Sequence, residues 1–229
     1  MKRIAKGGIA AVAVVGIAGG IVAGTASGSG SPERYYDVTV ENLTAGQPLS
    51  PPLIVQHTKR ASVWGVGEIA SHPVAAIAED ANNAPAISVL EQVRGVRDAQ
   101  TGIDAGAAGP APIGPGASQT YRIEARPRQQ ISLLSMLVNT NDGFTGLDGV
   151  RLGKARTVIM ARAYDAGSEE NNQLESHIPG PVGGNPFVRA PEGELVRMHP
   201  GVQAGVGDLD PAAYGWTGPV AKITISPVR

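Results

Sequence analysis

The sequence predicts a mostly β protein of the sandwich or barrel type, in one domain, with one or two short helices. The 229 residues include 31 glycines and 18 prolines, a content typical of folds with many turns. Several segments alternate apolar and polar residues with a period of two, as half-buried strands do. Nothing between Tyr35 and Arg229 has the composition of a linker, so we expect a single domain over residues 35–229.

The first strands are expected close to the start of this domain. Tyr36, Val38 and Val40 alternate with polar residues, which predicts a strand with one buried face. Leu53–Val55 follows two prolines and is a second expected strand, and Ser62–Val66 is expected to be a third.

The helical signal is confined to the next stretch of the chain. Ser71 can cap a helix that has Pro73 in its first turn. A second short helix is expected over Pro85–Arg94, with Gly95 as its stop. Both have an apolar face and should cover one side or end of a sheet. The inward residues are Val74, Ile77 and Ala78 in the first helix and Ile87, Leu90 and Val93 in the second.

The β pattern returns after a surface loop at Gly102–Gly116, which has no periodicity. Ser118–Arg126 alternates as a half-buried strand. Ile131–Val138 is almost wholly apolar, which predicts a central strand that is covered on both faces. Arg156–Tyr164 is expected to be the next strand, and Val220–Val228 the last, with Ala221, Ile223 and Ile225 on its buried face.

The chain begins with a segment typical of a secretory signal peptide over residues 1–26. Three cations open it, Lys2, Arg3 and Lys6. The uncharged run Gly8–Ala23 is short for a membrane span, and cleavage is expected after Ala26. Residues 27–34 then form a flexible tether. We expect a secreted protein, extracellular or periplasmic, with no stable membrane span once the leader is cleaved; the alternative is an uncleaved anchor.

Charge and cysteine content exclude several classes. Without the leader, 16 Lys and Arg face 20 Asp and Glu, a net charge of −4, so clustered positive charge for nucleic acid is lacking. The chain has no Cys, which excludes disulfides, thiolate metal sites and lipid attachment through a cysteine. Stability must therefore come from the core and from any bound ion.

Two carboxylate-rich turns flank the strand expected at Arg156–Tyr164, and they carry the main functional signal. The first turn is Asn141–Gly149, with Asp142; the second is Tyr164–Glu170, with Asp165 and, four residues later, Glu169. Carboxylate and carbonyl oxygens and water are the ligands of Ca²⁺ and Mg²⁺. The sequence therefore predicts a site for one such ion at the end of the sheet.

This prediction leaves alternatives open. Convergence of the two turns depends on Ile131–Val138 pairing with the strand at 156–164, which spacing alone does not establish. Asn-Asp and Asp-Gly are also ordinary turn residues. The long segment Asp165–Gly193 is expected to be a functional loop. Asp208 and Asp210 are read as a structural turn, and Asp148 and Glu170 as solvated turn residues.

Enzyme motifs are not found in the sequence. It has no Gly-x-Ser-x-Gly elbow, P-loop or dinucleotide fingerprint, so catalysis is not expected. The histidines lack zinc-ligand spacing; His72 is expected to be exposed at a helix start, and the loop histidines to anchor turns. The four histidines are His57, His72, His177 and His199.

Three segments, Asp142–Gly146, Ala163–Glu169 and His177–Pro179, together with Tyr36–Val40, resemble the spondin domain, the amino-terminal module of F-spondin and mindin. The resemblance covers nearly all of the chain after the leader. It implies an eight-stranded antiparallel β-sandwich that resembles synaptotagmin-type lipid-binding domains. It also implies secretion, one Ca²⁺ or Mg²⁺ ion at Asp142, Asp165 and Glu169, and binding to cells, matrix or microbial surfaces without catalysis.

Three departures limit the comparison. Gly143 stands where animal members usually have Trp, Glu169 stands in place of Asp, and the chain has neither cysteines nor thrombospondin repeats. It therefore looks like a bacterial stand-alone form, and integrin or matrix roles are not carried over. The leading hypothesis is a secreted cation-binding recognition or adhesion module for an extracellular protein or surface glycan. The alternatives are a metal-assisted extracellular hydrolase and a metal-free structural envelope protein.

Overall fold

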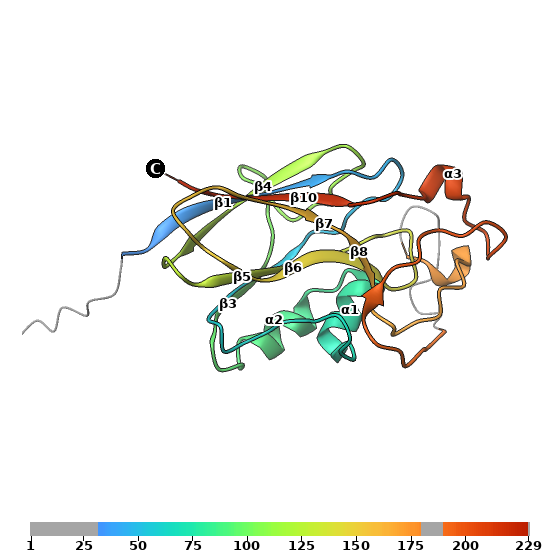
Figure 1. Ribbon diagram of the computed structural model, residues 1–229, viewed down its shortest axis with the longest axis horizontal. Coiled ribbons are helices and arrows are strands. Elements are labelled where there is room, and N and C mark those ends of the chain that lie inside the picture. The colour runs from blue at the N-terminus through green and yellow to red at the C-terminus, as the bar shows by residue number, and fades with distance from the viewer. Residues whose placement is uncertain (1–31, 180–189, 229) are drawn as a thin grey trace, which may run out of the picture. The chain divides into compact units, whose positions relative to one another are not determined.

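The computed structural model describes residues 32–179 and 190–228, which belong to one compact unit (Figure 1). Two antiparallel sheets, one of four strands and one of six, face each other. The predicted antiparallel β-sandwich is confirmed; the described residues form ten strands, where eight were expected, and three short helices. The predicted leader and residues 27–31 of the predicted tether lie outside the described residues.

The four-stranded sheet follows the alternation in the sequence. β1 (Arg34–Asn42) lies between β4 (Ser118–Ala125) and β10 (Ala221–Pro227), and β7 (Thr157–Ala161) is an edge strand. Tyr36, Val38 and Val40 are almost completely buried, as predicted, and so are Ala221, Ile223 and Ile225. These side chains pack in the core between the two sheets.

The six-stranded sheet has β5 (Gln130–Met136) near its centre, between β2 (Leu53–His57) and β6 (Gly143–Arg151). The described side chains of Ile131 and Leu133 point into the core between the sheets, and Leu134 packs into a second cluster on the other face. This confirms the prediction of a central strand covered on both sides. The strands are β2 (Leu53–His57), β3 (Val96–Thr101), β5 (Gln130–Met136), β6 (Gly143–Arg151), β8 (Ala163–Asp165) and β9 (Arg197–Met198).

Two helices cover the outer face of this sheet, α1 (His72–Asp80) and α2 (Ala84–Leu90) (Figure 1). α1 buries Val74, Ile77 and Ala78, the three predicted residues. α2 ends at Leu90, earlier than expected, so that Val93 is 37% exposed and the chain enters β3, a strand that was not predicted. α3 (Pro211–Tyr214) is a single turn whose N-terminus is capped by Asp210, in agreement with a structural role for that aspartate.

The predicted strand Ser62–Val66 is wrong. This segment is irregular, and its apolar character serves to anchor a loop on the sheet. Trp64 packs against Phe144 and Tyr164, with ring centroids 5.0 and 4.8 Å away, and its indole N–H donates to the Leu147 carbonyl at 3.3 Å.

The expected strand Arg156–Tyr164 divides at Arg162. Its first part, β7, belongs to the four-stranded sheet, and its second part, β8, to the six-stranded sheet. The expected pairing with Ile131–Val138 is also wrong, because β6 lies between β5 and β8.

β6 was missed because its sequence, Gly-Phe-Thr-Gly-Leu-Asp-Gly, has the composition of a turn. Its first five residues are nevertheless buried. A Cβ atom at Gly146 would collide with the Leu133 carbonyl, so glycine there permits close pairing with β5. The predicted turn at Asn141–Gly149 is therefore wrong from Gly143 onward.

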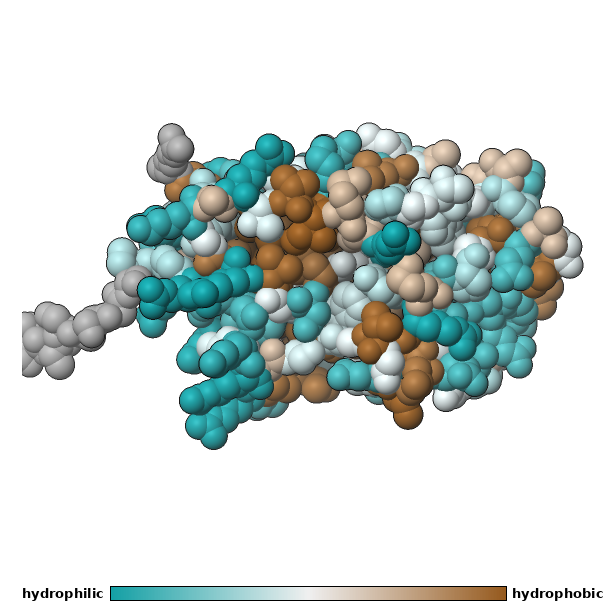
Figure 2. All heavy atoms as spheres, viewed as in Figure 1, coloured by the Kyte–Doolittle hydropathy of each residue, from teal (hydrophilic) through white to brown (hydrophobic). Residues whose placement is uncertain are grey.

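The surface alternates hydrophilic and hydrophobic areas on the face seen in Figure 2. Exposed large hydrophobic side chains include Val158 and Met160 on β7, and Ile69 and Leu195 near β9. None of the helices in residues 32–179 and 190–228 has the length and apolar character that a membrane crossing requires.

Candidate functional site

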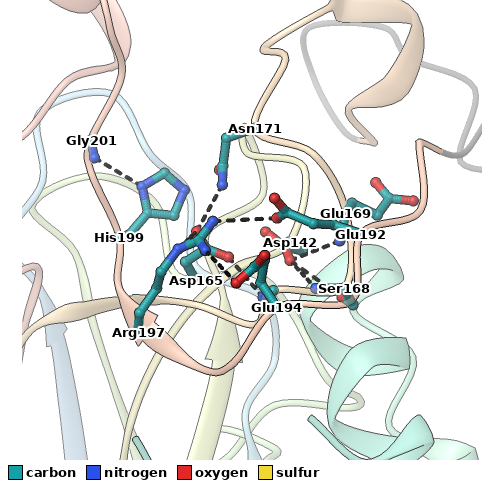
Figure 3. Close-up of polar contacts among 11 residues, drawn as sticks. Asp142, Asp165, Ser168, Glu169, Asn171, Glu192, Glu194, Arg197, His199 and Gly201 are labelled. Atoms are coloured by element: carbon teal, nitrogen blue, oxygen red, sulfur yellow. Dashed lines mark hydrogen bonds and ion pairs between the residues drawn. The ribbon is translucent and has the colours of Figure 1, made fainter. Parts of the chain in front are cut away.

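The strand pairing of β6 with β8 brings two of the predicted ligands together. Gly143 lies opposite Asp165 in this antiparallel pair, and Asp142 immediately precedes Gly143. The backbone N–H of Ala166 donates to the Asp142 carbonyl at 3.2 Å, so the pairing continues past the end of β8. Asp142 and Asp165 therefore lie side by side at one end of the six-stranded sheet (Figure 3).

Asp142 holds the loop that follows β8. Its Oδ2 accepts hydrogen bonds from the backbone N–H groups of Ser168, at 2.8 Å, and Glu169, at 3.0 Å, and from the Ser168 hydroxyl at 3.3 Å. Its Oδ1 is buried and has no hydrogen-bond partner among the described residues. The carboxylate thus has one oxygen with three donors and one buried oxygen with none in the described part of the chain.

Asp165 has donors on both oxygens. Oδ1 accepts from the Gly167 N–H at 2.8 Å, and Oδ2 accepts from Asn171 Nδ2 at 2.8 Å and from Arg197 Nε at 3.0 Å. Gly167 has φ +67°, and a Cβ there would meet the backbone of Glu194, so this tight turn requires glycine.

Arg197 is a member of the site that the sequence analysis missed. Its guanidinium contacts Asp165 and also two glutamates, Glu192 at 3.3 Å and Glu194 at 3.6 Å. The segment that carries these glutamates pairs with the loop after β8: the Glu192 and Glu194 N–H groups donate to the Ser168 and Gly167 carbonyls. No spacing rule links residues 192–197 to Asp165, and only the fold brings them together.

Burial and like charge act strongly on Asp142. Desolvation, followed by the neighbouring Asp165 carboxylate, raises the pKa of Asp142 to about 7, although the hydrogen bonds from Glu169 and Ser168 favour the charged form. Asp142 and Asp165 are both 0% exposed. A cation beside Asp142 would relieve this repulsion.

His199 lies next to these carboxylates (Figure 3) and accepts a hydrogen bond at Nδ1 from the Gly201 N–H at 3.0 Å. Burial lowers the pKa of His199 to about 4, against the opposing effect of Asp165. The neutral ring therefore carries its proton on Nε2, which is buried and has no partner among the described residues. In this tautomer Nε2 is a donor and offers no lone pair to a metal.

Glu169 completes the predicted set. Its backbone is fixed by the Asp142 hydrogen bond, and the residue is 1% exposed and lies in the same cluster of side chains (Figure 3). As the side chains lie, no group of three or more His, Asp or Glu residues in the described ranges forms a set that could hold a metal ion. Asp142 Oδ1 is the atom of this cluster that fits a hard cation, because it is a buried carboxylate oxygen without a donor.

Other residues considered in the sequence have structural roles. Asp148, expected to be a solvated turn residue, accepts hydrogen bonds from the Val63 N–H and from two hydroxyls, one of which belongs to Ser132. The same Ser132 hydroxyl lies 2.7 Å from Nε2 of the buried His57. His72 is exposed at the start of α1, as predicted. Asp208 accepts from the Glu175 N–H.

The chain was also compared with known proteins. No protein-family model matches it, and no curated protein sequence matches it. The spondin resemblance therefore stays a prediction, based on the segments quoted above.

Proposed function

We propose that this chain is a spondin-like extracellular recognition module, without catalysis, that binds one Ca²⁺ or Mg²⁺ ion through Asp142, Asp165 and Glu169. The observation that carries the proposal is the buried Asp142 Oδ1, which has no hydrogen-bond donor among the described residues and belongs to a carboxylate that lies beside Asp165. Oxygen ligands suit these two hard cations, and the tautomer of His199 gives no reason to expect a zinc site.

The ion would brace the loops at this end of the sandwich. Asp142 immediately precedes β6, Asp165 ends β8, and Glu169 belongs to the loop that continues toward Asn171. A cation shared by the three would fix that loop to the sheet edge. We propose that the loops so braced recognise an extracellular protein or a surface glycan, and that the leader directs the chain out of the cytoplasm.

The alternative of a metal-free structural module is favoured by a specific observation. Arg197 already supplies a positive charge to Asp165, and hydrogen bonds from Gly167 and Asn171 complete its contacts. In that case the acidic loops would be held by the guanidinium and the backbone alone. The two functions differ in whether a divalent cation stabilises the fold.

The test is thermal unfolding of the chelator-treated protein with Ca²⁺ or Mg²⁺ titrated back. An ion at about 100 times its dissociation constant should add about 2.7 kcal/mol to the free energy of unfolding. For a domain of this size the midpoint should rise by roughly 5–10 °C. Asp142→Asn and Asp165→Asn should abolish the rise, because each removes a charged ligand.

Asp37→Asn is the matched control. Asp37 lies on β1 in the other sheet, where it forms an exposed ion pair with Arg122, so this variant should keep the full ion response. A flat response of the wild-type protein to both ions would reject the cation site and leave the metal-free alternative.

A further inference from the structure

Arg197 is placed so that it can leave its partners. Its side chain is 44% exposed, whereas the Asp165 side chain that it contacts is 0% exposed. The other two partners, Glu192 and Glu194, are themselves partly exposed and lie on the same short segment. The long arginine side chain therefore reaches from the surface to a buried carboxylate, where it is the only cationic group in contact with Asp165 among the described residues.

The hydrogen bonds of Asp165 occupy three of its acceptor positions, including both on Oδ2. A carboxylate has about four acceptor positions, two on each oxygen. Oδ2 already accepts from Asn171 and Arg197, so an ion that binds this oxygen must displace one of them. Oδ1 accepts from the Gly167 N–H, which belongs to the tight turn itself.

Arg197 is the donor most easily displaced. Gly167 is fixed by its backbone turn, and Asn171 belongs to the loop that the Asp142 hydrogen bonds hold in place. The guanidinium, in contrast, is at the end of a flexible side chain. It would also repel a divalent ion that shared the same carboxylate, since like charges a few ångströms apart repel strongly in a buried site.

We infer that Arg197 is a built-in competitor of the divalent ion, and that ion binding proceeds by exchange with its guanidinium at Asp165. This inference rests on the proposed cation site and adds the residue that sets its affinity. In the ion-free protein Arg197 neutralises Asp165 and links it to Glu192 and Glu194. Ion binding releases Arg197 from Asp165 and thereby changes the charges displayed by the neighbouring surface.

Calorimetric titration of the full-length protein with Ca²⁺ tests the exchange. Arg197→Met keeps the length of the side chain and removes its charge, and it should raise Ca²⁺ affinity at least tenfold. Arg122→Met, which breaks the exposed ion pair with Asp37 on the other sheet, is the control and should leave the affinity within about twofold of wild type. An equal or weaker affinity of Arg197→Met, with clear binding by wild type, would overturn the exchange and leave the cation site standing.

A second readout uses the wild-type protein and does not depend on the folding of a variant. The Arg197 Nε–H, which donates to Asp165 without the ion, should change its ¹⁵N and ¹H chemical shifts on Ca²⁺ saturation as that hydrogen bond is lost. An unchanged Arg197 signal at saturating Ca²⁺ would refute the exchange. Absence of Ca²⁺ binding to wild type and to both variants would instead reject the proposed function itself.

Discussion

Asp142 and His199 make opposite contributions to the pH dependence of the stability of the ion-free protein. The pKa of Asp142 is raised from 3.8 to about 7, so the folded state holds an extra proton between these values, and stability falls as pH rises through this range. The pKa of His199 is lowered from 6.5 to about 4, so the unfolded state holds the extra proton, and stability rises with pH there. Between about pH 4 and 6.5 the two contributions oppose each other.

Substitution should separate the two effects in chelator-treated protein. In Asp142→Asn the stability should rise with pH from about 4 to 6.5, because the His199 contribution remains. In His199→Gln it should fall from about pH 4 to 7, by up to roughly 4 kcal/mol at 1.36 kcal/mol per pKa unit. Urea unfolding across this pH range measures both slopes. Parallel slopes in the two variants would contradict the assignment of these charges.

The surroundings of Gly143 account for one departure from the spondin pattern, the lack of a Trp after Asp142. A Cβ at this position would lie 2.5 Å from the Thr140 hydroxyl and 3.0 Å from the His199 ring. The Thr140 hydroxyl also accepts from the Gly143 N–H at 2.9 Å. The space that a larger residue would need after Asp142 is therefore filled by Thr140 and His199.

At the scale of elements, part of the six-stranded sheet is covered by the irregular loop around Trp64, where a strand was expected. The indole ring contacts Phe144 on β6 and Tyr164 on β8, the two strands that position the aspartates. Trp64 is 8% exposed. Its packing therefore supports the strand pair beneath the candidate site.

Trp64→Ala should lower the free energy of unfolding by about 3–5 kcal/mol, because it leaves a cavity between the loop and the two strands. Val66→Ala, in the same loop, is the control: Val66 is 59% exposed, and its loss should change stability by no more than about 0.5 kcal/mol. Denaturant unfolding compares the two. A cost below about 1 kcal/mol for Trp64→Ala would show that the loop does not support the sheet.

The elements that could be predicted are those whose apolar pattern is regular. The alternation in β1, β4 and β10, the apolar run of β5 and the apolar face of α1 all gave correct elements. β3 was missed because Val96–Thr101 is mostly polar and pairs through its backbone at a sheet edge. β6 was missed because its glycines and aspartate are turn formers that tertiary packing placed in a strand.

The candidate site was predictable in its acidic members and not in its surroundings. Asp142 and Asp165 could be named from their turns and from the family resemblance. Their proximity depends on the register of β6 with β8, and β6 was not visible in the sequence. Arg197 and Asn171 reach Asp165 from distant or irregular segments, so no periodic pattern marks them.

At the scale of the whole molecule, the proposed extracellular role depends on removal of the leader. Residues 1–26 are expected to be cleaved after Ala26, so mass spectrometry of the protein from its native host should find an amino terminus near Ser27. This start would support export of a free recognition module. A chain that keeps residues 1–26 would instead support the anchored envelope protein.

The division of one strand segment between two sheets has a consequence for how the molecule opens. β7 hydrogen-bonds to β10 in one sheet, and β8, which begins two residues after β7 ends, bonds to β6 in the other, with Arg162 alone between them. Because so short a connection joins β7 to β8, loss of strand pairing along this side of one sheet should disturb the pairing in the other. Backbone amides of both strands should therefore exchange with solvent in a single cooperative event. Asp165 ends this shared segment. The group that pairs with its carboxylate, Arg197 in this structure or the proposed ion, should therefore oppose the opening of both sheets.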